Sequence, residues 1–156
     1  MSLIQIVPAT DEHARAIAAR LREADKIELG EHAPERLLDI LLDAVRVSRW
    51  ANAALLDGAP VLVYGVSQHK KNSKWGVPWL LGTDGIEHIR RRFVRDSQGE
   101  VDLMLARFSF LFNQVHDRNQ LCIRWLMWLG FCIDFEHPVT HRGQTFLNFY
   151  RGNPHV

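Results

Sequence analysis

Three side chains near the C-terminus, Cys132, His137 and His141, are of types that bind zinc and lie at a spacing that suits it. Thiolates and imidazoles are the usual ligands of a structural zinc ion, which takes four of them in tetrahedral geometry. No fourth ligand is fixed nearby, and His141-Arg142-Gly143 has the composition of a hairpin turn. We therefore expect no metal site.

Two basic segments could contact phosphate groups. Arg90, Arg91 and Arg92 follow one another in an expected helix, where successive side chains point about 100° apart, so they spread around it instead of forming one patch. The loop from His69 to Trp75 places three lysines beside an aromatic ring, which can hold a single strand by charge and stacking. A mobile hairpin tip or a contact loop in an assembly accounts for the same residues. Because the net charge is only +1, we expect no nucleic-acid partner.

Composition excludes several other classes. The chain has no Gly-x-Ser-x-Gly motif, and Cys122 lies on an apolar helix face, so a hydrolase nucleophile lacks support. Two cysteines make no disulfide framework and favour a reducing compartment. The N-terminus lacks a secretory signal pattern, and no apolar run approaches the roughly 20 residues of a membrane span. With 156 residues, 47% hydrophobic, we expect a single soluble domain over 1–156.

Hydrophobic periodicity predicts the elements that position these groups. In chain order they are a strand at 3–7, a helix at about 11–25, a helix from Pro34, hairpin strands at 53–56 and 60–66 around Asp57-Gly58, a strand at 77–81, a helix at 86–108 interrupted at Ser97-Gln98-Gly99, a strand at 110–115, a helix after Asn119, and hairpin strands at 131–135 and 145–150. This order predicts an α/β domain built on a mixed sheet with flanking helices.

The helix after Asn119 is the most informative segment. Asn119 occupies an N-cap position, and Gly130 supplies the left-handed residue that closes the helix before Phe131. A broad apolar face, expected to be buried against the sheet, consists of Leu121, Cys122, Trp125, Leu126, Trp128 and Leu129.

The pattern Asn119, Cys122, Trp125, Gly130-Phe131 resembles the last strand-helix-strand unit of the GNAT acyltransferase fold. The resemblance implies a mixed, mostly antiparallel sheet whose central strands splay apart, with acyl-CoA in the gap between the strands at 77–81 and 110–115. Candidate residues lining that gap are Leu81, Gly82, Thr83, Asn113 and Asn119, together with Trp79. A buried Asn113 would either bind a ligand or bridge the strands.

The same resemblance argues against ordinary chemistry at this gap. GNAT enzymes hold the CoA pyrophosphate on a Gln/Arg-x-x-Gly-x-Gly/Ala loop, but this chain has Gly82-Thr83-Asp84-Gly85-Ile86-Glu87. Asp84 and Glu87 form a predicted capping box, which would occupy the N–H donors and repel a phosphate.

Two catalytic groups are also missing. The tyrosine that commonly protonates the departing thiolate is replaced by Leu126, which cannot transfer a proton, and the strand at 77–81 has no glutamate base. We therefore expect no catalytic residues and no bound cofactor.

A second resemblance is narrower. Pro78–Asp84 and Asn113–Val115 look like segments of the internal virion protein A family of short-tailed bacteriophages, which are small GNAT-like proteins. It implies a phage-encoded, catalytically degenerate protein in virion assembly or infection, present in the host cytoplasm or virion with virion or host proteins as partners. Two alternatives stay open, an active acetyl-CoA-dependent N-acetyltransferase and a small-ligand binding module.

Overall fold

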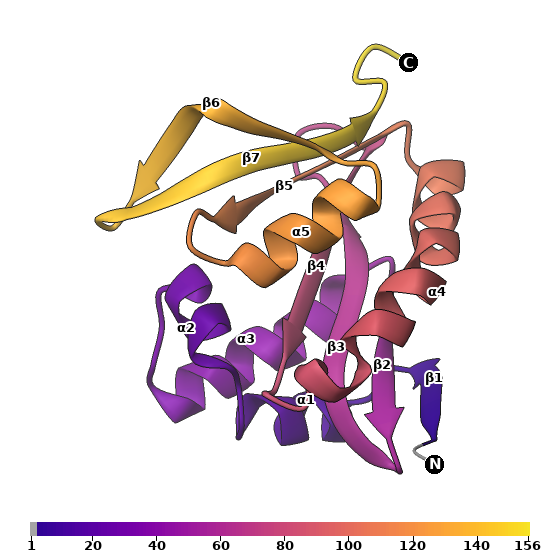
Figure 1. Cartoon of the computed structure of the whole chain (residues 1–156), viewed down its shortest axis with the longest axis vertical. Helices are drawn as coiled ribbons and strands as arrows, with labels where there is room; N and C mark the ends of the chain where they lie inside the picture. Colours follow the sequence, from indigo (N-terminus) through magenta and orange to yellow (C-terminus); the bar gives the residue numbers. More distant parts are fainter. Residues whose placement is uncertain (1–2) are drawn as a thin grey trace. The chain divides into compact units, whose positions relative to one another are not determined.

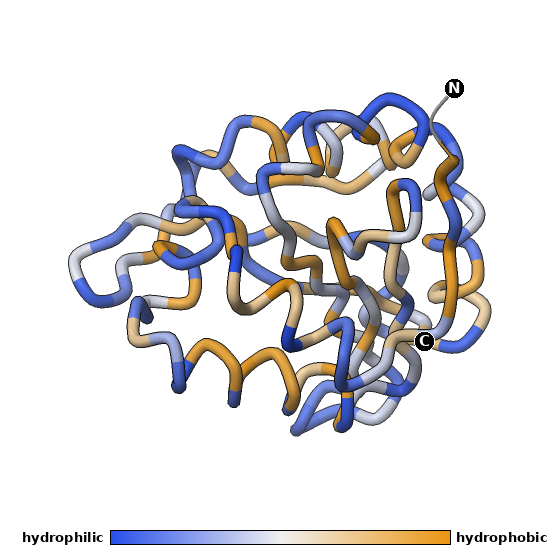
Figure 2. Tube along the Cα trace, turned by 90° about the horizontal axis from the view of Figure 1, so that it is seen from below, coloured by the Kyte–Doolittle hydropathy of each residue, from blue (hydrophilic) through white to orange (hydrophobic). Residues whose placement is uncertain are grey.

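A computed structural model describes residues 3–156, which form seven strands and five helices (Figure 1). Their bounds are β1 Ile4–Pro8, α1 Asp11–Ala18, α2 Glu23–Leu29, α3 Pro34–Val47, β2 Trp50–Leu56, β3 Ala59–Gln68, β4 Trp75–Gly82, α4 Ile86–Arg107, β5 Phe110–His116, α5 Gln120–Trp128, β6 Cys132–His141 and β7 Gln144–Gly152. Hydrophobic and hydrophilic stretches alternate along the backbone trace (Figure 2).

The strands are hydrogen-bonded in the order β1-β2-β3-β4-β5-β7-β6. The β1–β2, β2–β3, β5–β7 and β6–β7 pairs are antiparallel, whereas β4 and β5 are parallel. This is the predicted mixed, mostly antiparallel sheet with helices alongside. No helix of residues 3–156 is both long enough and apolar enough to cross a membrane.

The chain forms two compact units, each discontinuous in sequence. Unit 1 contains the described residues up to Ser67 together with Trp79–Arg90, and unit 2 contains Gln68–Pro78 and Arg91–Val156. Strand β4 and helix α4 therefore contribute to both units. The organisation of the chain as one domain stays a prediction.

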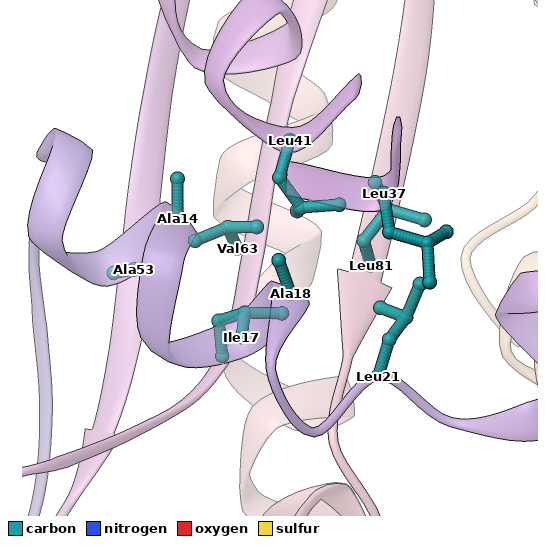
Figure 3. Close-up of a cluster of buried hydrophobic side chains, with 9 residues drawn as sticks. All are labelled: Ala14, Ile17, Ala18, Leu21, Leu37, Leu41, Ala53, Val63 and Leu81. Atoms are coloured by element: carbon teal, nitrogen blue, oxygen red, sulfur yellow. The ribbon is translucent and has the colours of Figure 1, made fainter. Parts of the chain in front are cut away.

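Unit 1 has a core of aliphatic side chains from two helices, three strands and the connection between α1 and α2. It consists of Ala14, Ile17, Ala18, Leu21, Leu37, Leu41, Ala53, Val63 and Leu81 (Figure 3). The α1 residues recur at helical spacing, so that one face of this helix meets α3 and the strands. Leu41 and Ile17 are fully buried, and each such side chain contributes about 1.5–3 kcal/mol.

The first helix differs from the prediction. Instead of one helix over about 11–25, α1 ends at Ala18 and α2 begins at Glu23. Between them, Leu21 forms a β-bridge with Thr83, and the Arg22 N–H donates to Gly82 O at 2.9 Å. These long-range backbone bonds, which periodicity does not report, break the helix. The chain consequently has three helices before its first hairpin, where we expected two.

Unit 2 contains the hairpin of β6 and β7, with β5 paired to β7 from Phe110↔Gly152 to His116↔Phe146. The interruption predicted at Ser97-Gln98-Gly99 is wrong, because α4 is continuous there. Nothing lies within 4 Å of a side chain added at Gly99, and the Ser97 hydroxyl donates to Val94 O within the helix. Gly99 is therefore tolerated as an exposed helical residue.

Candidate functional site

The turn between β4 and α4 is the segment that the GNAT resemblance aligns with the pyrophosphate-binding loop. Six of its backbone N–H groups donate to acceptors in the chain at 2.8–3.3 Å. The donors are Gly82, Thr83, Gly85, Ile86, Glu87 and His88, and their acceptors are, in that order, Asp25 Oδ2, Val61 O, Thr83 Oγ1, Thr83 O, Asp84 O and Gly85 O. An anion at this helix start would have to displace these acceptors.

The side chain that caps this turn is Thr83, not Asp84. The Thr83 hydroxyl accepts from the Gly85 N–H at 3.1 Å, whereas the Glu87 N–H donates to the backbone oxygen of Asp84 at 3.3 Å. The Glu87 carboxylate lies 3.5 Å from Arg90. The predicted Asp84–Glu87 capping box is therefore wrong, because the first turn closes with i→i+3 backbone bonds that leave no donor for the Asp84 carboxylate.

Asp25 is the functional candidate that sequence reasoning missed. It lies on α2 with 1% of its surface exposed, and its Oδ2 accepts from the Gly82 N–H at 2.8 Å. Its Oδ1 lies 3.8 Å from Arg22 NH1, and both of these buried atoms lack a hydrogen-bond partner. The carboxyl thus occupies, from inside the chain, an amide that the turn would otherwise present to a ligand.

Burial determines the charge of this carboxyl. Desolvation raises the pKa of Asp25 to about 7, and the Arg22 guanidinium and the Gly82 N–H oppose that shift only in part. Near neutral pH the protonated and ionised forms of Asp25 are therefore both populated. The only sequence signal was an acid three residues after an arginine, which is the usual pattern of a solvated helix face.

The start of the β4–β5 pair is a separate candidate region, and its residues belong to unit 2. The two strands pair at Trp75↔Phe110 and Gly76↔Leu111, and Asn113 Nδ2 then donates to Pro78 O at 2.8 Å. Asn113 Oδ1 accepts from the Gln114 N–H at 2.8 Å. Asn113 therefore bridges the strands, which is one of the two roles open from the sequence.

The other residues proposed to line the gap have structural contacts of their own. Leu81 packs in the core of unit 1, and Trp79 Nε1 donates to Ser48 Oγ at 2.7 Å. Asn119 is the N-cap of α5, since its side chain accepts from the Cys122 N–H at 3.4 Å. Leu81, Gly82 and Thr83 belong to unit 1, while Asn113 and Asn119 belong to unit 2. Their convergence on one gap stays a prediction.

Helix α5 differs from the expected buried face. Its buried residue is Ile123, whereas Trp128 is 50% and Met127 is 55% exposed. Gly130 has φ +84° and closes the helix in the left-handed conformation, as predicted. Leu126, at the position of the expected proton donor, is half-buried and carries no proton to transfer.

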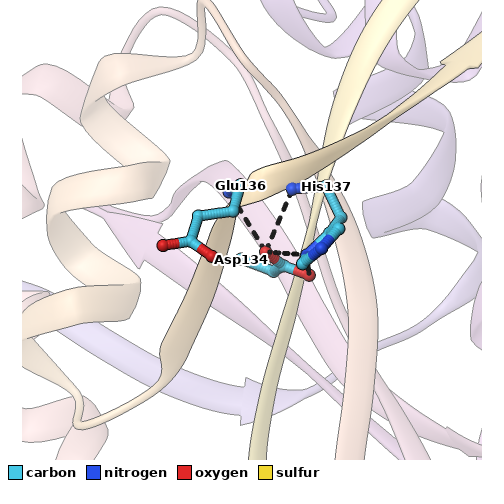
Figure 4. Close-up of polar contacts among 3 residues, drawn as sticks. All are labelled: Asp134, Glu136 and His137. Carbon is cyan, nitrogen blue, oxygen red and sulfur yellow. Dashed lines mark hydrogen bonds and ion pairs between the residues drawn. The ribbon is translucent and has the colours of Figure 1, made fainter.

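The zinc candidates do not form a cluster. No group of three or more metal-ligating side chains is present in residues 3–156. His137 instead pairs with Asp134, whose Oδ1 also accepts from the Glu136 and His137 N–H groups at 3.1 Å (Figure 4). This carboxylate caps the irregular segment of β6, where the register shifts between Asp134 and Val139.

The sequence matches no protein-family model and no curated protein. Solved structures nevertheless match nearly the whole chain. An acetyltransferase of the GNAT family from Streptococcus pneumoniae gives a TM-score of 0.57 at 13% identity, covering 96% of this chain and 99% of that one. The aminoglycoside acetyltransferase AAC(6')-Ib in complex with coenzyme A gives 0.70 at 12% identity, with 96% and 95% covered. The ribosomal-protein-S5-alanine acetyltransferase from Vibrio fischeri gives 0.63 at 14% identity, with 99% and 97% covered.

The chain has the GNAT fold. At these identities the similarity establishes architecture, and a fold hosts different activities on different sites. The residues of this chain, above all those of the β4–α4 turn, therefore decide which activity the fold can support here.

Proposed function

We propose that this protein is a GNAT-fold protein that does not carry out CoA-dependent acyl transfer. The supporting observation is the β4–α4 turn, where six consecutive or near-consecutive N–H donors already have acceptors within the chain. A helix start binds a diphosphate through free N–H groups and the positive end of its dipole. Here that capacity is used by the protein itself.

The residues present do not fit a coenzyme A diphosphate. At the β4–α4 turn, Asp25 is hydrogen-bonded to the first N–H, and its ionised form would repel a phosphate there. Asp84 and Glu87 add two exposed carboxylates to the same turn. Since exposed like charges and occupied donors both oppose binding, the turn disfavours an anion twice over.

Proton transfer has no candidate either. Leu126 is aliphatic, and β4, Trp75–Gly82, contains no titratable side chain. Without a positioned acid or base the factor of roughly 10²–10⁴ that such groups supply is lost. These features support a non-catalytic role for the GNAT scaffold.

The second candidate is an active N-acetyltransferase using acetyl-CoA. It is favoured by the likeness to structures of acetyltransferases and by the β4–β5 pairing, which is replaced by the Asn113 bridge to Pro78 after two residue pairs. Thermal unfolding with acetyl-CoA separates the two candidates. Ligand at a hundredfold excess over its dissociation constant stabilises the folded state by about 2.7 kcal/mol.

A paired substitution sharpens this test. Leu126→Tyr restores a hydroxyl at the position of the expected proton donor, and Leu121→Tyr makes the same change elsewhere on α5. We expect neither variant to release CoA from acetyl-CoA with a panel of primary amines, because six N–H groups of the β4–α4 turn still have acceptors within the chain. Activity in Leu126→Tyr alone would mean that only the proton donor had been missing.

Our proposal for the biological role is supported by the resemblance of Pro78–Asp84 and Asn113–Val115 to phage internal virion proteins. On this proposal the protein is phage-encoded and acts in virion assembly or infection, in the host cytoplasm or particle. Mass spectrometry of purified particles should then detect its peptides at a fixed ratio to a capsid protein. Their absence from particles and from infected-cell lysates would end this proposal.

A further inference from the structure

The β3–β4 loop and the end of α4 form a basic cavity in unit 2 that the proposed function does not use. A cavity of about 330 Å³ is lined by Ser73, Lys74, Arg107, Ser109 and Val156. It therefore combines two cationic side chains, Lys74 and Arg107, with the Ser73 hydroxyl. These are the donors that bind phosphate oxygens.

The loop that supplies Lys74 is held in one conformation by its own hydrogen bonds. His69 N donates to Trp75 O at 2.9 Å, and Lys71 N donates to His69 Nδ1 at 3.1 Å. Asn72 accepts twice, from Trp75 N through its backbone oxygen and from Lys74 N through Oδ1. The tip is thus a defined turn that presents its lysines to solvent.

Ser109 fixes the other side of the cavity. Its N–H donates to Lys74 O at 2.9 Å, and its hydroxyl donates to Lys74 O at 3.3 Å and to Val156 O at 3.2 Å, so this hydroxyl holds the cavity wall and is not left over for a ligand. Arg107, the last residue of α4, lies with its guanidinium carbon 4.8 Å from the centre of the Phe108 ring. The backbone of Lys74 is thereby hydrogen-bonded to Ser109, and the Arg107 guanidinium packs on the Phe108 ring.

The cations of this region are not neutralised by ion pairs. Lys70, Lys71, Lys74 and Arg107 are exposed, and none lies within 4.0 Å of a carboxylate in residues 3–156. The charges of these cations are therefore available to a bound anion.

The aromatic ring beside the lysines has a structural role. Trp75 packs at 5.0 Å from the Phe110 ring and 5.4 Å from the His69 ring, and its Nε1 is buried. It is therefore not a platform for a nucleic-acid base, which would need an accessible face. The region therefore offers a ligand positive charge and the Ser73 hydroxyl, without an aromatic face on which a base could stack.

We propose that this cavity binds a phosphate group through Lys74, Arg107 and the hydroxyl of Ser73. The phosphate is either free, as inorganic phosphate or a phosphomonoester, or part of a nucleic-acid backbone. The site lies within unit 2, on residues outside the β4–α4 turn. The proposed phosphate site can therefore be tested independently of CoA binding at that turn.

Two probes distinguish the sources in 50 mM salt. Inorganic phosphate is titrated into the ¹⁵N-labelled chain, with the amides of Lys74 and Ser109 followed by NMR. A fluorescein-labelled oligothymidylate of twelve nucleotides is titrated by anisotropy. Saturable shifts with phosphate indicate a free phosphate ligand, and oligonucleotide binding without them indicates a backbone ligand.

The matched variants are Lys74→Gln, which removes a cavity cation, and Arg92→Gln, which removes an exposed α4 cation that does not line the cavity. We expect Lys74→Gln to weaken binding of the active probe at least fivefold and to lower the salt slope, and Arg92→Gln to change it less than twofold. Equal losses in the two variants would show a general charge effect and overturn the proposal. Failure of both probes to bind would overturn it as well.

Discussion

The two turns that precede and follow β4 differ in which of their donors and charges already have partners within the chain. At the β4–α4 turn of unit 1, backbone donors are matched by acceptors, and a carboxyl, Asp25, is among them. At the β3–β4 loop of unit 2, internal bonds fix the backbone but leave Lys70, Lys71 and Lys74 without carboxylate partners. On our proposals, the β4–α4 turn does not bind a diphosphate, and a phosphate binds instead at the cavity lined by Lys74 and Arg107.

The comparison leads us to expect that the donors left over after folding determine where an anion binds on this fold. A helix start with its first-turn amides satisfied retains little of its capacity for phosphate. An exposed lysine without an ion pair keeps its charge available to a ligand. Substitutions in the β4–α4 turn should therefore change the free energy of unfolding. Substitutions in the β3–β4 loop should change the affinity for phosphate.

The largest expected effect comes from Asp25→Ala. It leaves the buried Gly82 N–H without its Asp25 acceptor and removes the carboxylate that lies 3.8 Å from Arg22. We expect the free energy of unfolding in urea to fall by about 2–4 kcal/mol. Asp39→Ala, which removes an exposed carboxylate from α3, should change it by less than about 0.5 kcal/mol. Equal effects of the two variants would contradict the role given to Asp25.

The second prediction is the pH dependence that Asp25 imposes. Its pKa is raised from 3.8 to about 7 in the folded state, so between these values the folded chain binds more protons than the unfolded one. Stability from this group is therefore present below pH 4 and lost as the pH rises through 7, at most about 1.4 kcal/mol per pH unit.

Asp25→Asn isolates this contribution. The amide oxygen can still accept from the Gly82 N–H, but the side chain no longer titrates. The difference in unfolding free energy between Asp25→Asn and the native chain should grow in favour of the variant from pH 5 to pH 8. The pKa values of three other carboxyl groups, Asp11, Glu31 and Asp134, are lowered, so these groups titrate below that pH range. Their contributions to stability are the same in both chains and cancel in the difference. A constant difference would refute the raised pKa.

A smaller effect is expected at Thr83. Thr83→Val removes the hydroxyl that accepts from the Gly85 N–H and keeps the side-chain shape. We expect a loss of about 1–2 kcal/mol in unfolding free energy, because a part-buried donor is left unpaired. Thr83→Ser retains the hydroxyl and should retain most of the stability. If Thr83→Val proves neutral, Thr83 is not what closes this turn.

The smallest effect tests Asn119, a structural residue of unit 2. Asn119→Ala removes the N-cap of α5 and should cost about 1 kcal/mol, while Asn119→Asp preserves an acceptor for the Cys122 N–H. Thermal unfolding of the two variants measures the difference. Equivalent losses would mean that Asn119 stabilises the chain by another interaction.

Much of the fold was predictable because its signals are local. The Asp57-Gly58 hairpin, Pro34 at the start of α3, and Asn119 and Gly130 at the ends of α5 each follow from backbone preferences of single residues. The GNAT resemblance rested on such local signals and agrees with the solved structures.

The candidate site was less predictable because its interactions are long-range. Asp25 lies 57 residues from Gly82 in sequence, and the bridge of Leu21 to Thr83 breaks a helix that periodicity extends. The exposed Trp128 and the uninterrupted α4 at Gly99 likewise depend on packing, which composition alone does not report.

The most direct test of the closed β4–α4 turn is thermal unfolding with up to 1 mM acetyl-CoA, using the native chain and Lys74→Gln, with AAC(6')-Ib as a positive control. Lys74→Gln removes a cation of the basic cavity, so phosphate bound there cannot be mistaken for coenzyme bound at the turn. We predict no change in the midpoint temperature of Lys74→Gln. A saturable rise of roughly 5–10 °C in both chains would contradict the closed turn and establish acetyl-CoA as a ligand.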